Sequence, residues 1–215
     1  MKVIAINGSA RKTWNTGTLL QQALEGAASL GATTELVHLY DLDYQGCTSC
    51  FACKLVGGPS EGRCAMQDGA TPLLHRIEAE ADVLILGSPI YFGSMSGEMH
   101  SFLERLLFAP FVYSNPGGSL FPRRIRTGFI YTMNVNATIS TRLGYEKMFA
   151  ATAGSLQRIL GECETFCSYD TCQFPDYSKV VMEYLDPVHK QAQRQEVFPE
   201  ECRRAFEFGR RLAGG

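Results

Sequence analysis

Short, fully apolar runs alternate along this chain with longer segments in which apolar residues recur every three or four positions. The runs at residues 2–6 and 83–86 predict strands covered on both faces, since a half-exposed strand would alternate apolar with polar residues. The longer segments predict amphipathic helices. The first of these helices, over residues 16–30, is expected to stop at Gly31, because glycine readily ends a helix.

Predicted strands and helices follow one another from one end of the chain to the other. The further strands are expected at 34–39, 126–131 and 165–169, and the further helices at 71–80, 96–107, 145–160 and 199–212. Such alternation implies right-handed crossovers and a parallel sheet with helices on both faces. Five strands fit an α/β, three-layer, flavodoxin-like fold with strand order 2-1-3-4-5, in which ligands bind beyond the carboxyl ends of strands one and three.

Length and composition narrow the class of protein. The 215 residues suit one domain over 1–215, with a cysteine-rich loop at 46–68 and a loop rich in aromatic residues, Pro and Gly at 108–124. The net charge of −2 and the lack of basic runs argue against nucleic-acid and membrane partners. The chain starts directly on a strand and has no apolar stretch of membrane-spanning length, so we expect a cytoplasmic protein. Eight cysteines then indicate metal or redox chemistry rather than disulfides.

The loop after the first strand has the composition of a phosphate site. It leads into a helix N-terminus, where free backbone N–H groups and the helix dipole attract anions. Ser9 and Thr16 add hydroxyls, Arg11 adds a guanidinium, and Asn15 either donates through its amide or caps the helix. Because the Gly-rich patterns of triphosphate and dinucleotide sites are missing, a single terminal phosphate fits better. The alternative is an ordinary polar loop.

The loop expected after the third strand, residues 87–97, leaves the same edge of the predicted sheet. Pro89 fixes the backbone, Tyr91 and Phe92 offer flat apolar surface, and Gly93 permits close approach. These residues predict a surface on which a planar ring system lies. The alternative is a turn whose aromatic side chains pack into the core.

Together, the two loops resemble those of the NADPH-dependent FMN reductase and iron-sulfur flavoprotein family. The segments that carry the likeness are Gly8-Ser9-Ala10-Arg11 with Asn15-Thr16, Gly87-Ser88-Pro89-Ile90-Tyr91-Phe92-Gly93, and Phe102-Leu103-Glu104-Arg105, which is similar to the family's Phe-x-Asp-Arg segment. The resemblance runs from the first strand to about Arg105. One departure is His100, which stands where the family usually has Lys.

The resemblance implies FMN as the cofactor. In this family's pattern the phosphate would be held by Ser9, Arg11, Asn15, Thr16 and Gly17, and the isoalloxazine would be flanked by Pro89, Ile90, Tyr91, Phe92 and Gly93. The loop after the fourth strand would close the far side through Thr132 and Asn134.

A cysteine loop follows the second strand. Cys47, Cys50 and Cys53 stand at steps of three, and Cys64 comes after an intervening stretch, residues 54–63. Four thiolates are the usual ligands of a [4Fe–4S] cluster, and the family's iron-sulfur members carry a similar but more compact pattern. A structural zinc site and a loop of free thiols remain alternatives. Because the loop leaves the same sheet edge, it could lie close to the flavin.

The function we expect is an FMN-dependent oxidoreductase that takes a hydride from NAD(P)H and passes electrons to a quinone, flavin, metal or protein acceptor, with or without the cluster. The flavin performs the redox chemistry, so no catalytic side chain is required. The resemblance also implies a homodimer or homotetramer, and the aromatic loop at 108–121 could supply the subunit contact. The alternatives are a non-enzymatic flavin or iron-sulfur electron carrier and a redox- or metal-sensing cysteine module.

Overall fold

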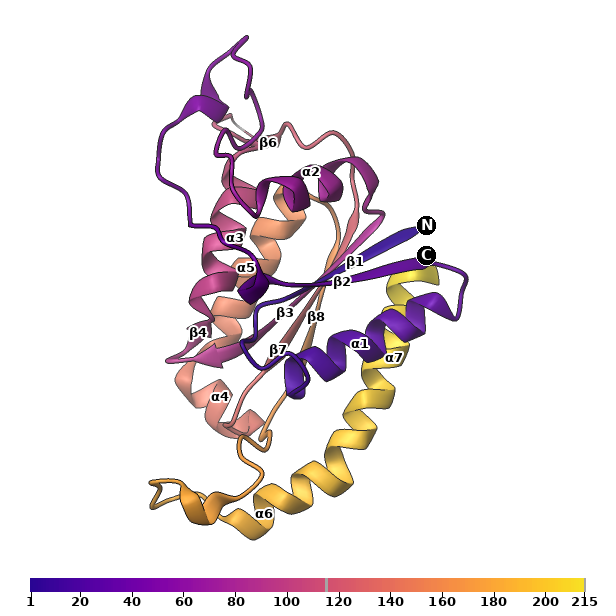
Figure 1. Cartoon of the computed structure of the whole chain (residues 1–215), viewed down its shortest axis with the longest axis vertical. Coiled ribbons are helices and arrows are strands. Elements are labelled where there is room, and N and C mark those ends of the chain that lie inside the picture. Colours follow the sequence, from indigo (N-terminus) through magenta and orange to yellow (C-terminus); the bar gives the residue numbers. More distant parts are fainter. Residues whose placement is uncertain (115, 215) are drawn as a thin grey trace.

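Five parallel strands form the centre of the computed structural model, which describes residues 1–114 and 116–214 (Figure 1). They are β1 (Lys2–Asn7), β2 (Thr33–His38), β3 (Val83–Tyr91), β7 (Arg126–Thr132) and β8 (Cys163–Ser168). Their order, β2-β1-β3-β7-β8, confirms the predicted flavodoxin-like order 2-1-3-4-5. The sheet also contains a sixth strand, β4 (Ser94–Met95), which runs antiparallel to the end of β3.

Helices cover both faces of the sheet (Figure 1). One face carries α1 (Asn15–Ala28) and α7 (Phe198–Gly214), and the other carries α2 (Thr71–Glu80), α3 (Gly97–Phe108) and α5 (Tyr145–Ile159). The remaining helical segments are α4 (Ala137–Leu143), α6 (Pro187–Ala192), the π-helix η4 (Gln193–Val197) and the 3-10 turns η1 (Leu39–Asp41), η2 (Ala52–Lys54) and η3 (Tyr177–Lys179). No described helix has the length and apolarity needed to cross a membrane.

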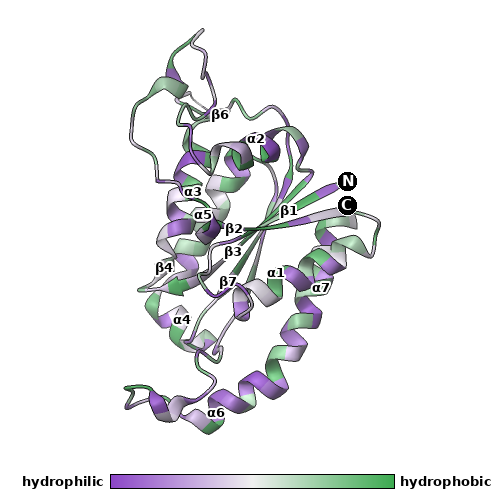
Figure 2. Ribbon diagram, in the orientation of Figure 1, coloured by the Kyte–Doolittle hydropathy of each residue, from purple (hydrophilic) through white to green (hydrophobic). Residues whose placement is uncertain are grey.

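The core has two halves, one on each side of the sheet. In β1, Ile4 and Ile6 pack toward α2, α3 and α5, whereas Val3 and Ala5 pack toward α1 and α7. All four side chains are fully buried. Successive side chains of a strand point to opposite faces, so a strand covered on both sides has to be apolar at every position. The strands are accordingly mostly apolar in Figure 2, whereas α6 and the start of α7 are largely hydrophilic.

Two glycines let α1 and α7 approach closely. A Cβ atom on Gly26 would lie 1.9 Å from the Phe206 carbonyl oxygen, and one on Gly209 would lie 1.8 Å from that of Ala23. These distances are far below van der Waals contact, so a side chain at either position would push the helices apart. The close pairing holds the long C-terminal helix against the helix that begins at the predicted phosphate loop.

The strand predicted at 83–86 is longer than the sequence pattern indicates. β3 continues to Tyr91 and turns back into β4, so much of the loop predicted at 87–97 is a hairpin. Gly87 is the last β3 residue paired with β1. Ser88 and Pro89 pair with β7 alone, and Ile90 and Tyr91 pair with β4. A proline has no N–H to donate to a neighbouring strand. Pro89 is tolerated because β3 has no strand partner on one side at this position.

The segment predicted as a long loop at 108–124 also contains regular structure, a short antiparallel pair of β5 (Phe111–Val112) and β6 (Gly118–Ser119). The helical segments α4, α6 and η4 were not predicted. The stretch from α6 through η4 is short of apolar positions, so periodicity gives little signal there.

Candidate functional site

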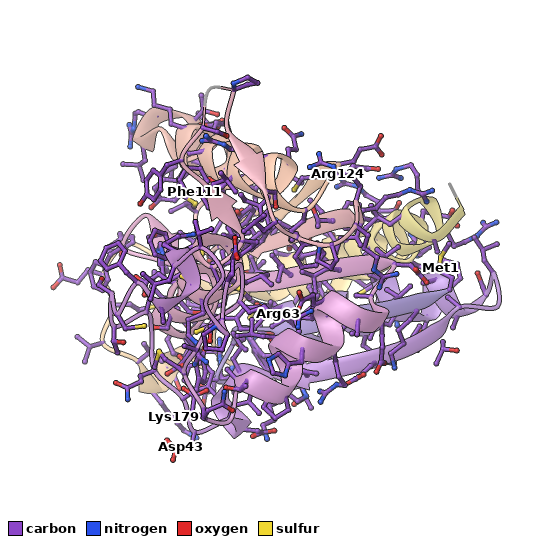
Figure 3. The ribbon with its side chains drawn as sticks, turned by 90° about the horizontal axis from the view of Figure 1, so that it is seen from above. Met1, Asp43, Arg63, Phe111, Arg124 and Lys179 are labelled. Atoms are coloured by element: carbon purple, nitrogen blue, oxygen red, sulfur yellow. The ribbon has the colours of Figure 1, made fainter. Side chains whose placement is uncertain are left out.

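The ends of β1, β3 and β7 meet at the carboxyl edge of the sheet. In Figure 3, Met1 lies on the opposite side of the molecule from Asp43 and Lys179, which follow β2 and β8 and mark this edge. Parallel strands all end on one side, so loops distant in sequence are brought together here. This is the edge at which the sequence predicts a ligand.

Direct hydrogen bonds join the segment after β1 to β3 and to the residue that precedes α3. The Gly8 N–H donates to the Gly87 carbonyl oxygen at 2.8 Å, and Ser96 Oγ donates to the Gly8 carbonyl oxygen at 2.6 Å. Ser96 also caps α3, because its Oγ accepts from the Met99 N–H at 3.3 Å. It is fully buried, and sequence reasoning missed it as a site residue, although a Ser before a helix is an ordinary capping signal.

The first turn of α1 presents a set of free donors. The helix begins at Asn15 with Trp14 in the cap position, so Asn15 is not the capping residue. Throughout residues 1–114 and 116–214, no hydrogen-bond partner occurs for the backbone N–H groups of Asn15, Thr16 and Gly17. Together with the dipole of a helix of 14 residues, these groups suit an anion such as a phosphate.

Gly17 makes this cradle sterically possible. A Cβ atom at this position would lie 1.8 Å from the Lys12 carbonyl oxygen. The loop therefore folds directly over the first turn of α1, with no room for a side chain between them. The predicted phosphate-loop glycine thus has a physical role in shaping the loop.

Two buried threonines connect α1 to the end of β7. Thr16 Oγ1 and Thr132 Oγ1 lie 2.8 Å apart, and both residues are almost fully buried. One hydroxyl donates to the other, so the hydrogen of the accepting hydroxyl stays available to a third group. The structure therefore brings the predicted residues Thr16 and Thr132 into contact at the same edge.

The β3–β4 hairpin carries the predicted aromatic surface. Phe92 and Gly93 both have positive φ, +50° and +81°, as a two-residue type I′ turn requires. Positive φ is uncommon for a bulky residue such as Phe. Phe92 is fully exposed and Tyr91 is half exposed, so the alternative that these rings pack into the core is wrong. Pro89 and Ile90 lie at the base of the hairpin, half-buried.

Asn134, in the segment after β7, has a buried side-chain oxygen without a hydrogen-bond partner among the described residues. A buried acceptor without a partner costs free energy unless a ligand or water donates to it. The pyrimidine end of a flavin carries one ring N–H donor. With the free N–H groups of α1 and the exposed rings of the hairpin, this acceptor means that the residues present fit FMN.

A buried ion pair supports the Asn134 segment. Lys190 of α6, which is 3% exposed, donates to the Asn134 carbonyl oxygen at 2.8 Å and to Asp170 Oδ1. His189 Nε2 lies 2.6 Å from the other oxygen of Asp170. Burial acts to raise the pKa of Asp170, but the hydrogen bonds and charges of Lys190 and His189 outweigh it, and the pKa lies below its ordinary value.

Replacing Asp170 by Asn is expected to reduce the acid sensitivity of the fold. A carboxylate with a lowered folded-state pKa contributes stability above its unfolded pKa, about 4, and that contribution is lost as the pH falls through the folded pKa. The wild-type urea midpoint should therefore fall more between pH 6 and pH 3 than that of Asp170→Asn. Glu183→Gln, an exposed control, should keep the wild-type slope. Equal slopes for Asp170→Asn and wild type would contradict the expectation.

The cysteine loop runs away from the hairpin. The Cys47 N–H donates to Glu104 Oε2 at 3.0 Å, and Lys54 Nζ donates to the carbonyl oxygens at the end of α3, including that of Ala109 at 3.0 Å. At 1.5 Å per residue, the two ends of α3 are roughly 16 Å apart, and Figure 1 shows the loop at the end opposite β4. The part of the loop around Lys54 therefore lies at the opposite end of α3 from the hairpin.

The four predicted metal ligands are not gathered around one centre. Cys53 is buried and burial raises the pKa of its thiol, whereas Cys50 is exposed. Cys64 instead accepts a hydrogen bond from Arg105 Nε at 3.3 Å. Among the residues that the structure describes, no three His, Cys, Asp or Glu side chains are placed to hold a metal ion. The arrangement of Cys47, Cys50, Cys53 and Cys64 thus does not fit a [4Fe–4S] cluster or a zinc ion.

Arg105 organises the base of the cysteine loop. Its side chain is fully buried and pairs with Asp68 Oδ2 at 2.6 Å, and its Nη1 also donates to the Gln45 carbonyl oxygen at 3.3 Å. Burial acts to raise the pKa of Asp68, but the hydrogen bond and charge of Arg105 hold it below its ordinary value. One guanidinium on α3 thereby ties together the start and the end of the loop.

Two solved structures with similar folds are a quinone oxidoreductase and an azoreductase. An NAD(P)H:quinone oxidoreductase from Methanothermobacter marburgensis has a TM-score of 0.72 at 13% identity and covers 99% of this chain and 98% of its own. An azoreductase from Bacillus anthracis has a TM-score of 0.65 at 15% identity, and the match covers 98% of this chain and 99% of the azoreductase. At such identities the likeness shows the shared flavodoxin-like fold alone.

Sequence comparison finds relatives that are similar over about half of this chain. An iron-sulfur flavoprotein of Methanocaldococcus jannaschii is 39% identical over 105 residues, 49% of this chain and 51% of its own. An iron-sulfur flavoprotein of Archaeoglobus fulgidus is 35% identical over 105 residues, which are 49% of this chain and 48% of the relative. The chain thus spans about half the length of the curated relatives it matches. A sequence model of NADPH-dependent FMN reductases matches residues 1–121, which include β1, the predicted phosphate loop, β3 and the hairpin. The chain therefore belongs to the NADPH-dependent FMN reductase family.

Proposed function

We propose that this protein is an FMN-dependent oxidoreductase that takes a hydride from NAD(P)H and passes electrons to a quinone, flavin, metal ion or protein acceptor. The observation that carries the proposal is the joining of the two loops: the free N–H groups at Asn15–Gly17 and the β3–β4 hairpin meet at one sheet edge through Gly8 and Ser96. This is where flavodoxin-like folds bind nucleotides. Bound FMN would supply the two-electron chemistry.

In this proposal the chain's own residues bind and orient the FMN. The first turn of α1, with Ser9 and Arg11, would hold the phosphate, and the Thr16–Thr132 pair would fix the adjoining segment. Asn134 would accept from the flavin ring, and the hairpin would lie along the isoalloxazine. The exposed ring of Phe92 leaves apolar surface for a flat electron donor or acceptor. No side-chain acid or base is needed in this scheme.

The protein is further proposed to be a homodimer or homotetramer. Support comes from apolar side chains exposed in the aromatic segment, where Tyr113 packs edge-on against Phe111 and Leu120 is half exposed. Scattered exposed apolar residues are common, but several within one segment favour a contact surface. Light scattering after size-exclusion chromatography tests this part. A monomer at all concentrations would contradict it.

The central proposal is tested by titrating the purified protein with FMN and then mixing the complex with NADPH or NADH in an anaerobic stopped-flow instrument. We expect saturable quenching of flavin fluorescence and bleaching of the visible flavin absorption by at least one nicotinamide. Failure to bind FMN would contradict the site. Binding without bleaching would leave the flavin site but contradict the reductase.

A cluster-bearing electron carrier is the second candidate, and the observation that favours it is the spacing of Cys47, Cys50 and Cys53. The arrangement of these thiols does not fit a cluster, so the first proposal passes electrons from the flavin directly to the acceptor. Iron and acid-labile sulfide analysis of protein purified without oxygen separates the two. Near-stoichiometric iron and sulfide with no nicotinamide reactivity would favour the carrier.

A further inference from the structure

A short helical segment near the C-terminus reaches both loops of the proposed FMN site. Lys190 of α6 donates to the Asn134 carbonyl oxygen at 2.8 Å, and Arg194 of η4, one turn later, donates from Nη1 to Asn15 Oδ1 at 2.9 Å. Two cations of one helical stretch thus contact the ring end and the phosphate end of the site. The stretch lies outside residues 1–121, which the family's sequence model matches. A π-helix such as η4 is rare and is frequently found at functional sites.

The contacts of Asn15 fix the orientation of its amide. Asn15 Nδ2 donates to the Cys172 carbonyl oxygen at 2.9 Å, and Oδ1 accepts from Arg194. A carbonyl oxygen only accepts and a guanidinium only donates, so the opposite orientation would lose both hydrogen bonds. Asn15 is 5% exposed, and it is the first residue of α1. Arg194 therefore holds the residue whose backbone N–H opens the anion cradle.

Two guanidinium groups lie over the indole ring of Trp14, beside this cradle. The Cζ of Arg194 is 5.0 Å from the ring centroid and that of Arg11 is 4.8 Å. The Trp14 Nε1–H donates to the Cys172 carbonyl oxygen at 3.1 Å, which fixes the ring. Neither arginine forms a salt bridge within the described part of the chain. The site therefore keeps two positive charges that no carboxylate neutralises.

We infer that Arg194 is a positioning residue that makes the site selective for the phosphorylated flavin, FMN, over riboflavin. The inference rests on the proposed FMN site and adds to it a residue from outside the matched family region. Arg194 acts in two ways: it holds Asn15 and thereby the first turn of α1, and it adds positive charge close to a dianionic phosphate. Riboflavin has no phosphate, so it gains from neither effect. Lys190 has the contrasting role, because it supports the ring end that both flavins share.

The test measures the dissociation constants of FMN and riboflavin by fluorescence quenching for wild type, Arg194→Gln, Arg194→Lys, Lys190→Met and Arg204→Gln. Arg204 is the matched control, since its guanidinium also lies over an aromatic ring, that of Phe166, at 5.3 Å from its centroid. Charge-assisted contacts are the strong ones, so Arg194→Gln should lower the FMN-over-riboflavin preference by about tenfold or more. Arg194→Lys should restore part of it.

The other variants separate a specific role from a structural one. Lys190→Met should weaken both flavins by similar factors, and Arg204→Gln should leave both constants unchanged. The FMN affinity of wild type should fall more steeply with salt than that of Arg194→Gln, because a charge contact is screened. Equal losses of FMN and riboflavin binding in Arg194→Gln, or an unchanged ratio, would overturn the inference. Wild-type protein that binds no FMN would instead overturn the proposed function.

Discussion

Replacing Gly17 by alanine is expected to weaken FMN binding by about 100-fold or more, a free-energy change of roughly 2.7 kcal/mol. The added methyl group would lie 1.8 Å from the Lys12 carbonyl oxygen, so the loop would have to move off the first turn of α1. That movement would separate the free N–H groups of the cradle from the other phosphate ligands. Fluorescence titration with FMN measures the change directly.

Gly154→Ala supplies the control for this experiment. Gly154 lies in α5, where an added Cβ meets no atom within 4 Å, so alanine there should stabilise the helix by about 0.5–1 kcal/mol and leave FMN binding unchanged. Circular dichroism shows whether each variant is folded. A folded Gly17→Ala protein that binds FMN with wild-type affinity would show that the cradle is not the phosphate site.

Replacing Arg105 by methionine is expected to lower the free energy of unfolding by about 3–5 kcal/mol. The Arg105 side chain is fully buried, and its loss leaves Asp68 without the cation that pairs with it at 2.6 Å. The hydrogen bonds to Cys64 and to the Gln45 carbonyl oxygen are lost as well. Urea unfolding at pH 7, followed by circular dichroism, measures the effect.

The pH dependence of stability gives a second test of the role of Arg105. Because Arg105 holds the pKa of Asp68 below its ordinary value, the pair contributes stability above pH 4 or so and loses it as the pH falls through the folded pKa. The difference in the free energy of unfolding between wild type and Arg105→Met should therefore become smaller toward pH 3. Arg63→Met is the control: Arg63 is largely exposed in its pair with Glu78, and its loss should cost less than about 1 kcal/mol. Similar losses in the two variants would contradict the assigned role of Arg105.

Arg105 also explains how the cysteine loop departs from its sequence pattern. Steps of three between Cys47, Cys50 and Cys53 are compatible with one centre, but the path of the loop depends on what holds its two ends. Here Arg105 donates a hydrogen bond to the Cys64 thiol, and Lys54 donates to the carbonyl oxygens at the end of α3.

The pattern of apolar positions by itself predicted the parallel sheet and the two loops at its carboxyl edge, and five strands fitted the flavodoxin-like order that the structure confirms. These follow from local information: a strand covered on both faces has to be apolar at every position, and the loop at its carboxyl end is placed by the sheet. The helix α2, predicted over residues 71–80, has those boundaries in the structure.

Only the tertiary structure decided which side chains complete the site and where the cysteine loop runs. Arg194 meets Asn15 across 179 positions of sequence, and Lys190 reaches Asn134 across 56. Neither contact has a periodic signal, because each depends on how α6 and η4 are placed in the folded chain. Hydrophobic periodicity reports which face of an element is buried, whereas a polar contact between distant segments is set by the packing of the whole chain.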